Sequence, residues 1–274
     1  MGDIRPSDEH GAVPVLPENE VRVLVTGFGP FLKQFPINPS HEIAKALPTH
    51  LTIPTPRSTT TLPPSSTPSA PSTTRISITA HPTPIKVAYA PTHAAVPALL
   101  APSPDRPTPD LVLHIGLAAG RSFFAIEKSS AKYGYDRNAD VDGLRWAAAD
   151  SERAWKGVPE RLETGLAFDA VWEAWRKGLG GLVGRKQADV VEVRPSDDVG
   201  SYLCGFIYFN SLAWFWQREG EERSDAAVER PVLFLHVPAC PEERDVERGR
   251  DITIELIKAM VATWLVQKEK AAVR

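Results

Sequence analysis

Val232-Leu233-Phe234-Leu235-His236-Val237-Pro238 is an apolar run that contains one histidine and ends at a proline. A short run of this kind is typical of a strand that is buried on both faces of a parallel sheet. Three more runs have the same character, over residues 21–26, 111–116 and 189–193. Apolar residues at helical spacing recur over residues 167–179 and 251–267. Strands that alternate with helices in this way predict an α/β protein with a largely parallel sheet.

The composition excludes several classes of function. The chain has 274 residues, of which 42% are hydrophobic, and this suffices for a sizeable core. A formal net charge of −3 argues against a general nucleic-acid binder, because phosphate contacts need a concentrated basic surface. Two cysteines make no disulfide framework, and residues 1–20 contain no apolar segment of a secretory signal. Since no apolar stretch approaches the ~18 residues of a membrane helix, we expect a soluble, cytoplasmic protein.

Two segments are expected to lie outside the packed structure. The first ordered element begins near Val21, so residues 1–19 are predicted to be a flexible tail. Between residues 51 and 75, 19 of 25 residues are Ser, Thr or Pro. Such a stretch cannot bury enough apolar surface to offset the entropy of ordering it, which predicts a disordered insert. A pair of strands at 76–79 and 85–89 and a helix over 92–100 are expected to follow.

Four unusual segments follow the predicted strands and are expected to meet at one edge of the sheet. They are the loop over residues 28–31, the turn over 119–121, the approach to Cys204, and His236 itself. In open α/β sheets, ligands bind beyond the carboxyl ends of the strands. The sequence therefore predicts a functional site at this edge.

Cys204 and His236 have the residue types of nucleophilic catalysis. If Ser201 is the N-cap of the helix that follows, Cys204 lies near the third helical position, where unpaired N–H groups and the helix dipole favour a thiolate. A histidine beside the thiol would act as its base. A carboxylate is needed to orient the imidazole, and Glu127 at the end of an apolar run is our choice, with Asp197 and Asp198 as rivals.

Each of these residues also has a plain structural interpretation. Cys204 and His236 could be core residues, and Glu127 could pair with Lys128 or Arg121 at the sheet edge. Phe28 and Phe31 could pack in the core or form two walls of an apolar slot, because Gly29 and Pro30 fix the loop between them. His114 and Cys240 are assigned to structure, and the glycines at 27–29 lack the spacing of a dinucleotide signature. No metal site or cofactor is expected.

Five segments together resemble the pyroglutamyl peptidases of type I, the pyrrolidone-carboxylate peptidases of cysteine peptidase family C15. The N-terminal signature is Thr26-Gly27-Phe28-Gly29-Pro30-Phe31 followed by Asn38-Pro39-Ser40, and the glycine-rich turn is His114-Ile115-Gly116-Leu117-Ala118-Ala119-Gly120-Arg121. Glu127-Lys128 stands for the Glu-Arg pair of the family. The nucleophile segment is Gly200-Ser201-Tyr202-Leu203-Cys204, and the histidine segment is Phe234-Leu235-His236-Val237-Pro238.

The resemblance implies a single three-layer α/β/α domain over residues 20–270 and a triad of Cys204, His236 and Glu127. It implies a thiol protease that releases N-terminal pyroglutamate (5-oxoproline) from peptides through a thioester, without a cofactor. The substrate-binding residues would be Phe28, Phe31, Asn38 and Leu117, with the lactam ring between the two phenyl rings and Asn38 as support for the pocket.

The chain departs from the family pattern at several places. Leu117 stands where many relatives have glutamine, and Gly205 stands where asparagine is usual. Residues 133–142 follow the Asn- and Asp-rich segment of the family only loosely, and the loop from Phe31 to Asn38 is one residue longer. Two alternatives stay open, namely a cysteine hydrolase of another blocked amide and a non-catalytic binder of pyroglutamyl termini. Pyroglutamyl peptides are the expected partners, nucleic acid and membranes are not, and assembly into a homo-oligomer is left open.

Overall fold

The computed structural model describes residues 20–31, 33, 36–56, 72–103, 107–183, 192–218, 230–240 and 242–273. Its strands are β1 (Glu20–Gly27), β2 (His50–Pro54), β3 (Thr73–Ala80), β4 (Leu111–Leu117), β5 (Phe124–Glu127), β6 (Ser129–Ala131), β7 (Arg161–Glu163), β8 (Val193–Ser196) and β9 (Val232–Val237). Its helices are α1 (Pro39–Ala46), α2 (Tyr89–Leu100), α3 (Ala148–Ala154), α4 (Phe168–Val183), α5 (Leu203–Arg218) and α6 (Glu243–Ala272).

The central sheet has seven strands in the order β2-β3-β1-β4-β9-β5-β8. Neighbours are parallel except for β2 with β3 and β5 with β9, so the predicted parallel character is confirmed. β6 and β7 form a separate antiparallel pair. In the middle of the sheet, Gly116 of β4 pairs with His236 of β9, which in turn pairs with Ala125 of β5.

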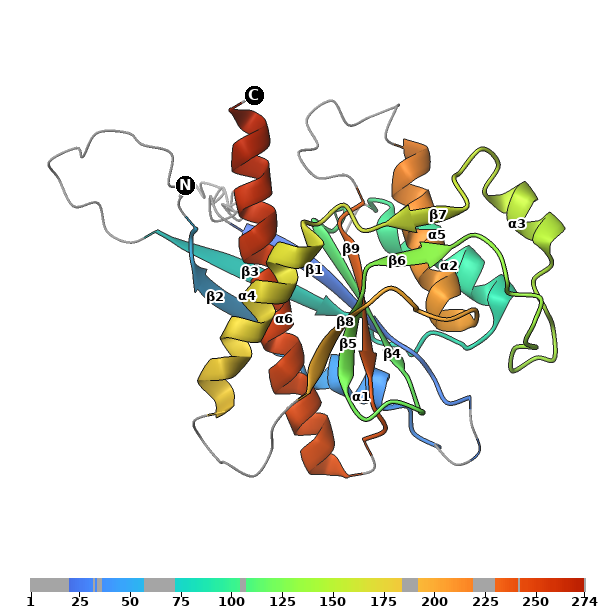
Figure 1. Ribbon diagram of the computed structural model, residues 1–274, viewed down its shortest axis with the longest axis horizontal. Helices are drawn as coiled ribbons and strands as arrows, with labels where there is room; N and C mark the ends of the chain where they lie inside the picture. Colours follow the sequence, from blue (N-terminus) through green and yellow to red (C-terminus); the bar gives the residue numbers. More distant parts are fainter. Residues whose placement is uncertain are drawn as a thin grey trace, which may run out of the picture.

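Helices cover both faces of the sheet, which makes the three layers that the motifs implied (Figure 1). On one face, α1, α4 and α6 pack against alternate strand residues such as Val23 and Val25. On the other, α2 and α5 pack against Leu24, Val112 and Phe234. Because successive strand residues point to opposite faces, a strand enclosed on both sides is buried at every position, as β4 and β9 are.

The predicted disorder over residues 51–75 is wrong at both ends. Residues 50–54 and 73–77 form β2 and part of β3 and pair antiparallel, with Ile53 opposite Thr74 and both buried. A count of Ser, Thr and Pro conceals this alternation, and threonine is itself a good strand former because its branched side chain suits a pleated surface. Residues 57–71 and the proposed tail at 1–19 lie outside the described residues.

Three other predicted elements differ from the structure. Residues 85–89 form no strand: Ile85 makes one bridge to Phe28, and α2 begins at Tyr89, three residues before the predicted start of this helix. Most of the strand predicted at 189–193 lies outside the described residues, and β8 begins at Val193. Among the helices of the described part of the chain, none is both long and apolar enough to span a membrane.

Candidate active site

The carboxyl ends of β1, β4 and β9 bring three of the predicted segments to one edge of the sheet. β1 leads into the loop with Phe28, β4 ends at Leu117, and β9 carries His236 one residue before its end. Beside β9 runs β5 in the antiparallel direction, so Glu127 at its end lies opposite Phe234 and not at this edge. This arrangement agrees with the edge predicted from the sequence, because parallel strands end together.

The register of β5 against β9 brings Glu127 to His236. His236 pairs with Ala125, and Glu127 lies two residues farther along the same face, which is the diagonal position of a strand pair. Nδ1 of His236 lies 2.7 Å from Oε1 of Glu127, and both residues are buried. The carboxylate therefore accepts a hydrogen bond from Nδ1–H, and Nε2 is left as the basic nitrogen of the ring.

Glu127 is stabilised as a carboxylate although no part of it reaches solvent. Burial alone would raise its pKa, but hydrogen bonding to His236, the charge of that ring, and the side chains of Ser196 and Arg121 outweigh it and lower the pKa below the ordinary value. The backbone of Glu127 is held as well, because the Tyr208 hydroxyl of α5 donates to its carbonyl at 3.0 Å. A fixed, ionised carboxylate is what an orienting partner of histidine requires.

Cys204 is the second residue of α5, one position nearer the helix start than an N-cap at Ser201 implied. Its sulfur lies over β4, since a Cβ placed on Gly116 would come within 2.8 Å of Sγ. Gly116 is also the strand partner of His236, so the thiol and the imidazole flank the same residue. The sulfur can approach β4 so closely because that residue has no side chain.

The electrostatic surroundings of Cys204 differ from what the helix start alone predicted. Burial and the nearby charge of Glu127 raise the pKa of the thiol to about 12, and they outweigh Arg121 and the hydrogen bond from the residue's own backbone N–H, which lower it. The expected stabilisation of a free thiolate is therefore wrong for this environment. A thiol in these surroundings stays protonated at neutral pH, so a nucleophilic role of this sulfur would require a base.

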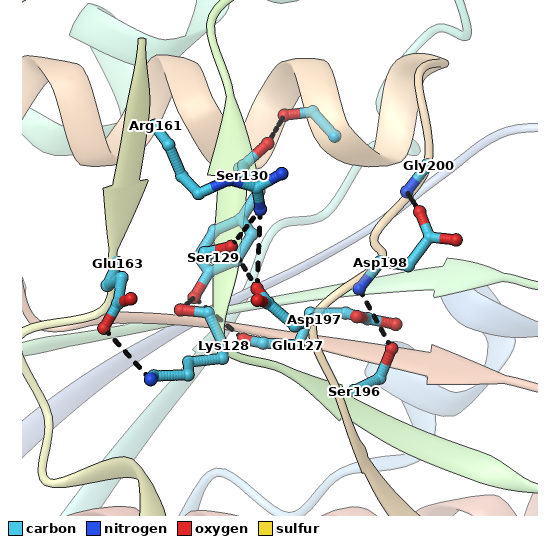
Figure 2. Close-up of polar contacts among 12 residues, drawn as sticks. Glu127, Lys128, Ser129, Ser130, Arg161, Glu163, Ser196, Asp197, Asp198 and Gly200 are labelled. Atoms are coloured by element: carbon cyan, nitrogen blue, oxygen red, sulfur yellow. Dashed lines mark hydrogen bonds and ion pairs between the residues drawn. The ribbon is translucent and has the colours of Figure 1, made fainter. Parts of the chain in front are cut away.

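Asp197 and Asp198, the rivals of Glu127, have other partners (Figure 2). Asp197 accepts from the hydroxyl of Ser129 and pairs with Arg161, whereas Oδ1 of Asp198 accepts from the N–H of Gly200 at 3.2 Å. Both side chains thus hold the turn that precedes α5. Ser130 fixes the helix itself, since its hydroxyl donates to the carbonyl of Gly205 at 2.7 Å.

A small cavity opens beside the sulfur. It is lined by Phe28, Phe31, Asn38, Val87, Leu117, Tyr202, Leu203 and Cys204, and its free volume is about 10 Å³, which is room for about one water molecule. Four of these were predicted as substrate-binding residues and one as the nucleophile. No charged side chain is among them, so the cavity suits a neutral group, and its walls must move apart to admit a ring.

Asn38 contributes to this cavity mainly by holding its wall. Its Nδ2 donates to the carbonyl of Gly29 at 2.9 Å, and its Oδ1 accepts from the N–H and the hydroxyl of Ser40. Ser40 in turn accepts from the N–H of Phe28 at 2.9 Å. The N-cap of α1 and the loop between the two phenylalanines are therefore one connected unit.

One residue of the site was not predicted. Tyr202 lines the cavity and packs against Phe31 with ring centroids 6.1 Å apart. The available signal was an aromatic residue two positions before the cysteine. Arg121 contacts Glu127, which is the pairing that the structural interpretation of this carboxylate named. His114 is structural as predicted, because its two nitrogens contact Thr26 at 2.7 Å and Ser211 at 2.9 Å inside the core. Cys240 is a free thiol, half-buried beside the start of α6.

The described residues hold no group of three or more His, Cys, Asp or Glu side chains that could bind a metal ion.

The architecture is that of a three-layer α/β protein whose candidate site lies where its central parallel strands end. Comparison with known proteins specifies this class further. No protein-family model matches the chain.

Pyroglutamyl-peptidase 1 of Mus musculus and that of Homo sapiens are each 29% identical to the chain over 154 residues. The alignment covers 56% of this chain and spans 59% of the length of each of these relatives. The solved structure of pyrrolidone carboxyl peptidase from the hyperthermophile Pyrococcus furiosus is 20% identical and superposes with a TM-score of 0.57, over 92% of this chain and 100% of that one. The resemblance found in the five motifs is thus confirmed, and the fold is that of the pyrrolidone carboxyl peptidases.

Proposed function

We propose that the chain is a cysteine peptidase that removes N-terminal pyroglutamate from peptides. The observation that carries this proposal is the cavity in which Phe28, Phe31 and Cys204 share one small space. The hydrogen-bonded pair of His236 and Glu127 on the adjacent strands supports a catalytic rather than a merely binding site.

The proposed mechanism begins with the protonated thiol. Nε2 of His236 takes the proton of Cys204 as the sulfur attacks the pyroglutamyl carbonyl carbon, and backbone N–H groups at the start of α5 stabilise the oxyanion. The imidazolium then gives its proton to the leaving amine, the C–N bond breaks, and a thioester remains. Water attacks this thioester with His236 again as base, which releases pyroglutamate and restores the thiol.

The neutral lining of the cavity supports a preference for a blocked N-terminus. A peptide that begins with pyroglutamate has a lactam and no α-ammonium group, so it can enter an uncharged site without losing the hydration of a charge. The two phenylalanines and Tyr202 offer apolar surface to the faces of such a ring. Leu117 adds a further apolar side chain at a position where many relatives have glutamine. Because leucine cannot hydrogen-bond to the lactam oxygen, the preference of the cavity for a lactam over another neutral ring is weaker.

The expected partners are peptides, and we place their hydrolysis in the cytoplasm. Two free cysteines, one of them assigned as nucleophile, favour a reducing compartment.

Release of a fluorophore from a pyroglutamyl amide tests the proposal. We expect wild type and Cys240→Ala, which lacks the other thiol, to turn over alike, and Cys204→Ala to be inactive. Turnover that survives the loss of Cys204 would refute the assignment of the nucleophile. Absence of turnover in the wild type, with the amide still bound, would favour a non-catalytic binder; cleavage of other blocked amides alone would favour a hydrolase of different specificity.

A further inference from the structure

Arg121 joins the three segments that carry the proposed catalytic residues. It lies in the turn that follows β4, closed by a hydrogen bond from its N–H to the carbonyl of Ala118 at 2.9 Å. Its Nη1 donates to Oε1 of Glu127 at 2.7 Å, and its Nη2 donates to the carbonyl of Asp198 at 2.8 Å. One guanidinium thus connects the carboxylate at the end of β5 to the turn that leads into the Cys204 helix.

The contact with Glu127 uses the same oxygen that His236 uses. Oε1 accepts from Nδ1 of His236 and from Nη1 of Arg121, each at 2.7 Å. Since Nδ1 keeps its hydrogen and donates it in a hydrogen bond to this oxygen, Nδ1 has no free lone pair. The 3.4 Å approach of Nη1 to Nδ1 is therefore a close contact between a cation and the ring and not a further hydrogen bond.

We infer that Arg121 is a positioning residue, which fixes the Glu127 carboxylate beneath His236 and holds the turn before Cys204 at the distance at which the sulfur can react. This inference rests on the proposed peptidase activity. The planar fork of arginine suits the task, because its two Nη atoms can reach the carboxylate and the carbonyl at once. A lysine has one nitrogen and could keep only one of these contacts well.

Arg194 provides a matched control. Arg121 and Arg194 both lie over the ring of Phe123, with their Cζ atoms 5.8 and 3.9 Å from its centroid. The Nε of Arg194, however, donates to Glu192 at 2.7 Å, and the described structure shows no contact from it to Glu127 or His236. Arg194→Gln removes a nearby charge and a stacking contact while it leaves the proposed site intact.

The test compares Arg121→Gln, Arg121→Lys and Arg194→Gln with wild type in the hydrolysis of a pyroglutamyl amide. We expect Arg121→Gln to lower kcat by on the order of 100-fold, as small misplacements of reacting groups do, with KM changed less than about twofold. Arg121→Lys should be intermediate, and Arg194→Gln should match wild type. Added guanidinium should restore part of the activity of Arg121→Ala. An unchanged kcat in Arg121→Gln would overturn the inference.

A substrate-free measurement separates this inference from the proposed function and from misfolding. In a Cys240→Ala background, iodoacetamide alkylation reports Cys204 alone, and Arg121 lowers the pKa of this thiol. We expect slower alkylation in folded Arg121→Gln, or in Arg121→Lys if the first variant does not fold, because the thiolate fraction falls about tenfold for each unit by which the pKa rises. Alkylation of the variant at the wild-type rate would refute a role for Arg121, whether or not any amide is cleaved. Slower alkylation of the variant, together with no amide cleavage by the wild type, would refute the peptidase activity alone.

Discussion

Gly116→Ala is the substitution that most directly tests the packing of the sulfur against the sheet. A methyl group at this position would lie 2.6 Å from Cζ of Phe234 and 2.8 Å from Sγ of Cys204. Favourable contacts between such atoms need about 3.5–4.0 Å, so ring and sulfur must each retreat by about 1 Å or β4 must move. Neither can move freely, because Phe234 is fully buried and Cys204 is held by the first turn of α5.

The expected cost follows from this crowding. Overpacking a core by a methyl group destabilises by about 1–3 kcal/mol, and each kcal/mol lowers the Tm of a domain of this size class by ~2–4 °C. Since the sulfur is one of the two groups displaced, turnover of a pyroglutamyl amide should fall by on the order of 100-fold, mostly in kcat.

Calorimetry and fluorogenic turnover together provide the assay, with Gly180→Ala as the control. Gly180 lies in α4 and has no atom within 4 Å of an added methyl group, so this change should leave turnover unaltered and raise stability by up to about 1 kcal/mol. If Gly116→Ala is as active and as stable as wild type, the sulfur does not lie over β4, and the account of the site is wrong.

Three further outcomes are expected. Gly205→Ala should unfold at a lower Tm than Gly180→Ala in calorimetry, because its methyl group would lie 2.2 Å from the carbonyl oxygen of Gly200; equal Tm values would contradict this close approach. Glu127→Gln should cost about 3–5 kcal/mol in urea unfolding at pH 7. Since the folded pKa of Glu127 is lowered, this deficit should be full above pH 4.5 and shrink as the pH falls below it, and a constant deficit would argue against an ionised carboxylate. Phe31→Ala should raise KM about tenfold and leave kcat nearly unchanged. An unchanged KM would show that Phe31 packs in the core and does not bind the substrate.

Much of the fold followed from the sequence because its central strands are buried on both faces. β4 and β9 are each apolar apart from one histidine, and in a chain of alternating strands and helices such runs are typical of the middle of a parallel sheet. The error over residues 51–75 has the opposite cause. β2 lies at the sheet edge and β3 lies beside it, where alternate residues can be threonine or proline without loss of stability. The composition therefore suggested disorder, whereas the pairing of the two strands orders these residues.

The site was predictable in its residue types but not in its electrostatics. Strand ends and a helix start drew attention to Cys204 and His236. Glu127 was chosen over its rivals because it ends an apolar run, and the family motifs implied the same residue. The pKa of Cys204 depends on burial and on Glu127, which is distant in sequence and near in space, so a local rule about helix starts gave the wrong direction. The contacts of Arg121 depend likewise on the register of β5 against β9.

The covalent intermediate offers the most direct test of the proposed activity. A pyroglutamyl substrate is mixed with the protein, the reaction is stopped in acid during turnover, and the cysteine-containing peptides are identified by mass spectrometry. The account predicts a pyroglutamyl thioester on Cys204 and none on Cys240. Cleavage of the substrate with the acyl group on Cys240, or undiminished cleavage by Cys204→Ala, would contradict it.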